Sequence, residues 1–265
     1  MSGKVVTVAN EKGGVGKTTT SVQLGFELAE RGNLVCIVDN DPSGDATTAL
    51  FGDDIPAAIR LGNKPEGVSN TIKMYAVDGD FEPIEITNNL FLMGATDALA
   101  MVGGADLQPA YEFNDSIDLL VEKFDYVIID CPPSFGLPFT AAMFSSSHGG
   151  IVIPLVPEDL PFKAAVKVEN RINETNKRFK MNLVVLGVLA NKVVNNPMSQ
   201  ETKFYLNEMQ EKFGDRVFKT EIHQTVKISG AIALQEKVSK YARPSSKAAL
   251  QIASFTDEVI ERLGS

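Results

Sequence analysis

The sequence predicts an α/β fold in which residues 1–265 form a single domain around a doubly wound, mostly parallel sheet with helices on both faces. Apolar runs of strand length recur along the chain, and helix-like segments separate them. The runs are continuous rather than alternating, which is typical of strands that are covered on both faces. With 44% hydrophobic residues the chain can bury one large core, and we find no linker that would divide it.

The expected strands are six such runs, at residues 5–9, 34–39, 126–130, 150–156, 183–191 and 217–222. A helix is expected over residues 18–32, where Val22 and Phe26 share one apolar face. Residues 52–90 break the pattern because they are rich in Gly, Pro, Asn and Asp. We therefore expect a surface excursion there, with a small hairpin.

Composition excludes several classes of protein. Charged residues make up 22% of the chain, which does not fit a disordered protein. Cys36 lies inside an apolar run and Cys131 directly follows one, so they indicate buried thiols in a reducing compartment rather than a disulfide framework. We find no signal peptide and no stretch of about 18 apolar residues, and we expect a cytoplasmic protein.

The stretch GGVGKTT follows the first expected strand and opens the first expected helix, which is the setting of a phosphate-binding loop. Its glycines let successive backbone N–H groups converge on phosphate oxygens, and the helix N-terminus adds a favourable dipole. Lys17 is expected to bridge the terminal phosphates of ATP, and the Thr18 hydroxyl to bind Mg²⁺. The expected nucleotide-binding residues of the loop are Gly13, Gly14, Val15, Gly16, Lys17, Thr18 and Thr19.

Carboxylates follow two of the expected strands. Asp130 ends the run YVIID, which is the Walker B position where a carboxylate supports the Mg²⁺ ion. Asp39 and Asp41 lie at the end of the second strand, and ligands gather at the carboxyl ends of strands in open α/β sheets. Asp41 is expected to orient the attacking water or to reach the Mg²⁺ shell. The alternative is that Asp41 only forms the turn before Pro42.

A second lysine, Lys12, precedes the loop, and KGGVGKTT is the deviant Walker A motif. On this motif the chain resembles the ParA/MinD family of ATPases, whose fold is that of a P-loop NTPase. The resemblance extends over nearly the whole chain. The later segments, which favour the ParA branch, are VDNDPSGDAT, FLMGATDALA, DYVIIDCPPSFG and FGDRVFKTEI.

The resemblance implies a homodimer that forms when ATP binds. Lys12 would reach across the interface to the phosphates of the other subunit, as an arginine finger does. The catalytic residues would be Lys12, Lys17 and Asp41, with Asp41 activating water and Asp130 in the Walker B role. Asn191 matches a position that contacts adenine, although a buried or capping asparagine would look the same.

Three other branches are weighed against ParA. A MinD-like protein has a basic amphipathic C-terminal helix for membranes, whereas this chain ends in the acidic IASFTDEVIERLGS, so we expect no membrane partner. Relatives of the nitrogenase iron protein need cysteines to hold a cluster, and neither cysteine here is placed for that. A kinase or ligase of a small metabolite remains an alternative, with residues 52–90 as its substrate pocket.

The ParA branch implies non-specific DNA binding in the ATP state, a separate adaptor protein that stimulates hydrolysis, and a location on the nucleoid. The net charge is −9, but residues 163–180 and 215–250 each carry a net charge of +4. His223-Gln224 stands where Pro-Arg is common in ParA proteins. The alternatives are solvated helix faces without a partner, or a switch that acts on a protein without DNA. The candidate DNA contacts are Lys219, Lys227, Lys237, Lys240, Arg243 and Lys247.

Overall fold

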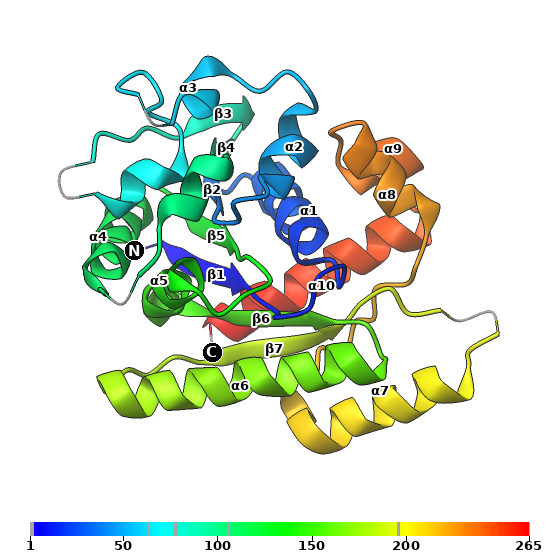
Figure 1. Ribbon diagram of the computed structural model, residues 1–265. Coiled ribbons are helices and arrows are strands. Elements are labelled where there is room, and N and C mark those ends of the chain that lie inside the picture. The colour runs from blue at the N-terminus through cyan, green and yellow to red at the C-terminus, as the bar shows by residue number, and fades with distance from the viewer. Residues whose placement is uncertain (1–2, 63, 77–78, 105, 195–196, 265) are drawn as a thin grey trace.

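The computed structural model describes residues 3–62, 64–76, 79–104, 106–194 and 197–264, and these residues are built around one sheet of seven strands (Figure 1). The strand order is β3-β4-β2-β5-β1-β6-β7. Every neighbouring pair is parallel except β3 and β4, which form an antiparallel hairpin. The strands are β1 (Lys4–Val8), β2 (Val35–Asp39), β3 (Ile84–Thr87), β4 (Leu90–Met93), β5 (Tyr126–Asp130), β6 (Gly149–Leu155) and β7 (Val185–Ala190).

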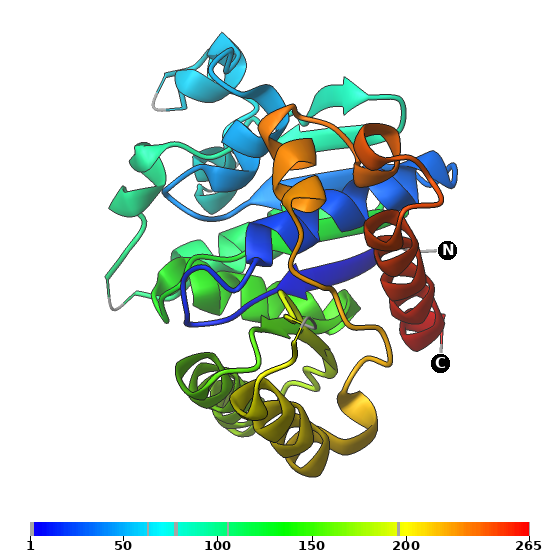
Figure 2. The same ribbon diagram turned by 90° about the vertical axis from the view of Figure 1, so that its right-hand side faces the viewer.

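Helices cover both faces of the sheet, as the two views at right angles show (Figures 1 and 2). One face carries α4 (Gln108–Val121), α5 (Leu137–Ser145), α6 (Asp159–Phe179) and α7 (Gln200–Phe213). The other face carries α1 (Lys17–Glu30), α2 (Asp45–Phe51), α3 (Ala57–Arg60), α8 (Val226–Ala233), α9 (Val238–Ala242) and α10 (Lys247–Gly264). The prediction of a doubly wound α/β fold is confirmed.

The continuous apolar strands follow from this two-sided cover. Side chains of a strand alternate between its two faces, so a strand packed on both sides needs apolar residues at every position. In β1, Val5 belongs to the core under α4–α7, whereas Val6 and Val8 belong to the core under α1 and α10. Cys36 and Cys131 are free and buried, as expected.

Two of the expected elements need correction. Residues 217–222 do not form a strand and make one isolated bridge to β7, between Val217 and Val188. The reason is that the backbone N–H groups of Lys219 and Thr220 donate to the Glu258 carboxylate of α10, each at 2.8 Å, instead of continuing a ladder. The hairpin within and after residues 52–90 is present as β3–β4, but β4 was not expected as a strand. The excursion is also not confined to the surface, since Ile59 and Met74 are fully buried.

The C-terminal helix α10 belongs to the core. Its apolar side chains Ile252, Phe255 and Val259 are buried against the sheet and α1. Among the helices that the structure describes, none has the length and apolar character needed to cross a membrane.

Candidate functional site

The expected site residues meet at the carboxyl ends of β1, β2 and β5. Asp39 is the last residue of β2 and lies in register with Asp130, the last residue of β5. The loop of residues 9–16 leaves β1 beside Asp130 and leads directly into α1. The sheet thus brings the glycine-rich loop and both strand-end carboxylates together, at the edge where open α/β sheets bind ligands.

The loop has the backbone geometry of a phosphate cradle. Gly14 and Gly16 adopt φ values of 78° and 90°, the left-handed region that favours glycine. A Cβ atom on Gly16 would lie 2.3 Å from Nδ2 of Asn191, so no side chain fits there. Asn10 fixes the start of the loop, since its side chain donates to the Pro154 carbonyl at 2.8 Å and accepts from the Lys12 N–H at 2.9 Å.

The two lysines of the motif occupy different environments. The Lys17 side chain is buried, and its Nζ donates to the Lys12 carbonyl oxygen at 3.4 Å, so it stays within the loop. Lys12 itself is exposed, and within the described ranges its ammonium group enters no ion pair. Lys17 is therefore placed to bind phosphates of its own site, whereas Lys12 is free to reach something outside the subunit.

Asp130 is held at the start of α1 by two hydroxyl groups. Thr18 and Ser21 donate to its two carboxylate oxygens at 2.8 and 2.9 Å. Burial raises the pKa of Asp130 to about 6, although these hydrogen bonds and Lys17 lower it. The hydroxyl of Thr18 and the carboxylate of Asp130 are hard oxygen ligands of the kind Mg²⁺ prefers, and a divalent cation would offset the cost of the buried charge. Two of the three expected metal ligands, Thr18 and Asp130, are thus in direct contact. Ser21 was not foreseen, although it follows Thr18 by three residues on one face of the helix.

Asp39 and Asp41 differ in their surroundings. Asp39 is fully buried and accepts hydrogen bonds from the Thr47 N–H and hydroxyl at 2.8 and 2.7 Å. Burial, and then the charge of Asp130, raise the pKa of Asp39 to about 8. Asp41 follows on the loop, where its carboxylate accepts from the Ser43 N–H at 3.0 Å. Asp39 therefore fastens α2 to the sheet, and Asp41 forms the turn while lying near the site.

A brace from the end of β7 holds the phosphate loop. Asn191 is buried and donates to the Val15 carbonyl at 2.8 Å, and Lys192 Nζ donates to the Gly14 carbonyl at 2.7 Å. Both bonds engage carbonyl oxygens, so the brace itself occupies none of the loop N–H groups that could bind a phosphate. Beside the brace lies a hollow of about 270 Å³. Its lining includes Thr19, Asn191, Ile222, Gln224 and Val226. Lys192 could not be placed here from local sequence, because its partner lies 178 residues earlier.

The candidate DNA contacts fall into two groups. Lys219, Lys227 and Lys247 are exposed and line two adjoining hollows between residues 219–227 and the start of α10. Lys237 is nearly buried and pairs with Glu27 at 2.8 Å and with Glu30, so it is not presented to a partner. Lys240 and Arg243 lie in and just after α9 and are exposed, with Lys240 paired to Glu236.

Comparison with known proteins agrees with this geometry. A family model described as an AAA domain matches residues 3–185. The sporulation initiation inhibitor protein Soj of Bacillus subtilis is 31% identical over 271 residues, which cover 97% of this chain and 98% of Soj. Among solved structures, a variant of McdA from Cyanothece in complex with ATP superposes with a TM-score of 0.81 at 20% identity, over 99% of this chain and 96% of that one. The septum site-determining protein MinD of Pyrococcus horikoshii, solved with Mg-ADP, gives 0.71 at 22% identity, over 97% and 95%.

Proposed function

Since the chain belongs to the ParA-type partition ATPases of the ParA/MinD family, we propose that it is a switch that dimerises on binding ATP and positions a cargo along DNA. In the ATP state the dimer binds DNA without sequence preference. An adaptor protein stimulates hydrolysis of ATP to ADP and phosphate, and this releases the dimer from the nucleoid. The observation that carries the proposal is the exposed Lys12 beside a complete phosphate-binding loop.

Different residues of one subunit bind the phosphates, the attacking water, the metal ion and the base. Lys17 and the loop N–H groups hold the phosphate chain, and Asp41 orients the attacking water. Thr18 and Asp130 would hold Mg²⁺, which supplies positive charge to the phosphate oxygens when it is bound. The adenine base takes the hollow beside Thr19, where Asn191 and Gln224 are the nearby amides. The side-chain amide of Asn191 already donates a hydrogen bond to the Val15 carbonyl, so a contact between Asn191 and adenine is still a prediction.

Dimerisation follows from the position of Lys12. The Lys12 ammonium group, which forms no ion pair with the described residues of its own subunit, contributes most when a second subunit brings phosphates to it. Lys12 then neutralises charge on the partner's ATP and makes hydrolysis depend on assembly. Catalysis that depends on dimerisation explains why one motif contains a buried lysine, Lys17, and an exposed lysine, Lys12.

DNA binding is assigned to Lys219, Lys227 and Lys247, because the fold gathers these three around one grooved surface. Non-specific binding needs cations that neutralise backbone phosphates and no base contacts. Because the whole chain carries a net charge of −9, only a local group of lysines can attract DNA. Removal of one of these lysines should therefore lower the affinity for DNA strongly. Lys237 contributes less than the sequence suggested, because two glutamates already neutralise it.

The proposal is tested by binding of the purified protein to random-sequence duplex DNA with ATP, ADP or no nucleotide, across a salt series. We expect binding only with ATP, with a steep loss of affinity as salt rises. Lys12→Ala should abolish it, and Lys227→Ala should weaken it and reduce the salt slope by about 1. Lys203→Ala removes an exposed lysine from α7 and serves as the matched control.

Two outcomes would change the assignment. If the protein dimerises with ATP but never binds DNA, the switch acts on a protein partner instead. If Lys227→Ala and Lys203→Ala bind DNA equally well, the DNA surface lies elsewhere on the molecule.

A further inference from the structure

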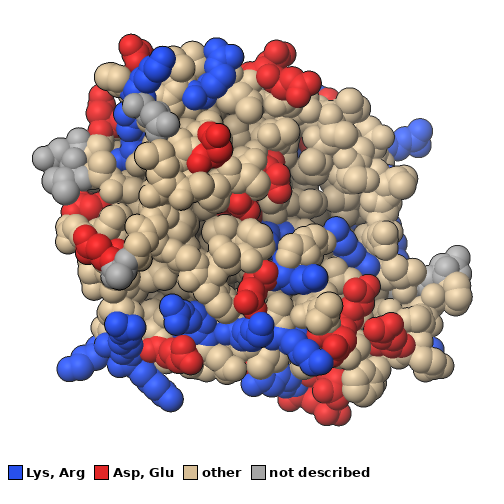
Figure 3. Space-filling view, in the orientation of Figure 1, with Lys and Arg blue, Asp and Glu red and all other residues tan. Residues whose placement is uncertain are grey.

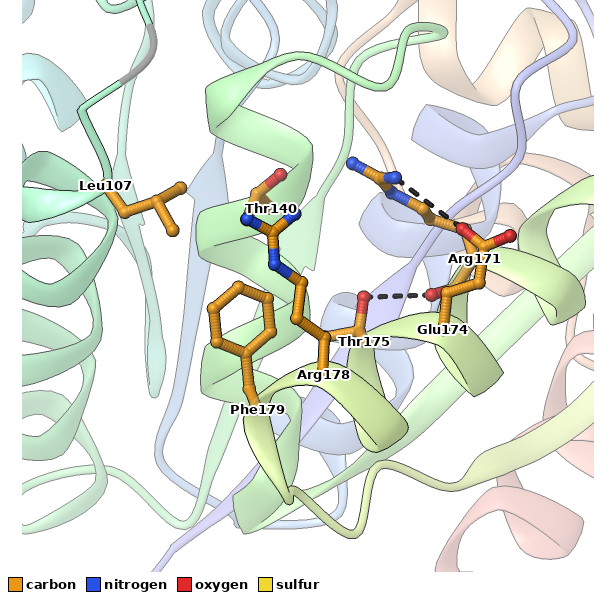
Figure 4. Close-up of a pocket in the computed structure, with 7 residues that line it drawn as sticks. All are labelled: Leu107, Thr140, Arg171, Glu174, Thr175, Arg178 and Phe179. Atoms are coloured by element: carbon orange, nitrogen blue, oxygen red, sulfur yellow. Dashed lines mark hydrogen bonds and ion pairs between the residues drawn. The ribbon is translucent and has the colours of Figure 1, made fainter.

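A pocket of about 210 Å³ lies between α5, α6 and the residue before α4, on the sheet face opposite to α8 and α10 (Figures 1 and 4). Arg171 and Arg178 approach it from α6, and Thr140 faces them from α5. Phe179 and Leu107 supply apolar walls. Glu174 and Thr175 complete the lining, so the pocket holds two guanidinium groups, one carboxylate and two hydroxyls beside its apolar surface. The net positive charge suits a carboxylate-bearing group attached to an apolar one.

The Arg178 guanidinium is held against an aromatic ring. It lies over the Phe179 ring at 5.3 Å, and Phe179 is itself held edge-to-face against Phe144 at 5.0 Å. In the part of the chain that the structure describes, no carboxylate forms an ion pair with Arg178. An arginine that is stacked in place and lacks a counter-charge binds a carboxylate without first breaking another contact.

Arg171 is only weakly engaged. Its guanidinium lies 3.7 Å from the Glu174 carboxylate, and both side chains are partly exposed, so this pair contributes little to stability. A second carboxylate can therefore displace Glu174 or bind beside it. Arg171 and Arg178 are seven residues apart, about two turns of α6, so their guanidinium groups lie on the same face of the helix. The pocket therefore presents two guanidinium groups to a ligand.

The same face of α6 continues toward the phosphate loop. Lys163 and Lys167 precede Arg171 at intervals of four residues, and Figure 3 shows Lys and Arg side chains gathered along this helix. Lys167 pairs at 3.0 Å with Glu11, the neighbour of Lys12. An acidic chain that extends beyond the pocket would compete with Glu11 for Lys167.

We propose that this pocket and the adjoining face of α6 bind a short acidic segment of a partner protein, with carboxylates on Arg171 and Arg178 and an apolar side chain against Phe179 and Leu107. Duplex DNA fits less well. The pocket is too small to admit a duplex. The proposal does not rest on the switch function, because it invokes neither ATP nor dimerisation.

The test is fluorescence anisotropy of a labelled peptide made of glutamate and leucine, titrated with the full chain without nucleotide. Arg178→Gln should weaken binding by roughly tenfold, the effect of losing a charge-assisted hydrogen bond, and the double variant with Arg171→Gln by more. Lys177→Gln makes the same change of charge on the neighbouring residue, which does not line the pocket, and should change affinity by no more than about twofold. Thermal unfolding confirms that each variant is folded.

Three results would overturn the proposal. The first is equal peptide affinity of Arg178→Gln and Lys177→Gln. The second is peptide binding that inorganic phosphate displaces completely at low concentration, which would indicate a simple anion site. The third is absence of peptide binding together with DNA binding that Arg178→Gln weakens, which would assign α6 to DNA. A failure of ATP-dependent DNA binding would not affect this test, so the two proposals fail separately.

Discussion

Asn191 offers the sharpest test of how the phosphate loop is held. Its side chain donates to the Val15 carbonyl at 2.8 Å and accepts from the Lys192 N–H at 2.9 Å. Asn191→Ala removes both hydrogen bonds and leaves the oxygen of a buried residue without its partner, which costs about 1–3 kcal/mol. If about 1–2 kcal/mol of this cost destabilises the loop conformation that binds nucleotide, the affinity for ATP drops roughly 5- to 30-fold.

The assay is titration of a fluorescent ATP analogue, with urea unfolding as the measure of stability. Asn176→Ala is the matched control, because Asn176 makes the same pair of bonds to the backbone of Leu183, at 2.9 and 2.7 Å, far from the loop. We expect similar losses of stability in both variants and loss of nucleotide affinity only in Asn191→Ala. Affinity for inorganic triphosphate should fall too, because the brace acts on the loop and not on the base. Equal nucleotide affinity in the two variants would refute the role of the brace.

Three further predictions concern buried charges and one glycine. Burial raises the pKa of Glu169, but hydrogen bonds from Lys212 and Arg216 outweigh burial, and its pKa in the folded protein lies below 4.5. The ionised Glu169 therefore stabilises the fold above pH 4.5, and this contribution is lost as the pH falls through the folded pKa. Glu169→Gln should lower the free energy of unfolding in urea by about 2 kcal/mol at neutral pH, and the two proteins should be equally stable in acid. The pKa of Asp39 is raised from 3.8 to about 8, so the stability that its protonated form provides is full below pH 3.8 and is lost as the pH rises through 8. Thermal unfolding of the wild type without nucleotide should show this decline. Asp130, whose pKa is raised only to about 6, adds its own decline at lower pH, so a decline between pH 6 and 8 that persists in Asp39→Asn would count against the assignment. Gly16→Ala should abolish ATP binding in the titration, whereas Gly13→Ala, with no atom within 4 Å of its added Cβ, should retain it.

The fold was predictable where local pattern and tertiary role coincide. Five of the expected strands are buried on both faces, and that burial is what makes their sequences continuously apolar. Residues 217–222 have a similar apolar pattern, and Phe218 and Ile222 are indeed buried. They do not pair as a strand because Glu258, distant in sequence, takes two of the backbone N–H groups. No local window contains that information.

The candidate site divides in the same way. The glycine-rich loop and the strand-end Asp130 could be found from sequence, since each depends on neighbours within a few residues. The brace by Asn191 and Lys192 and the pairing of Lys237 with Glu27 depend on contacts across more than 170 residues. Only the folded chain shows that Lys237 is occupied and that Lys219, Lys227 and Lys247 converge.

The central claim is that ATP joins two subunits through Lys12, and mass photometry tests it most directly. The protein would be measured with ATP, with ADP and without nucleotide, beside Lys12→Ala and the control Lys203→Ala. We expect a dimer with ATP alone in the wild type and in Lys203→Ala, and a monomer throughout in Lys12→Ala, although that variant still binds the fluorescent ATP analogue. A wild-type monomer with bound ATP, or an ATP-dependent dimer in Lys12→Ala, would contradict the claim.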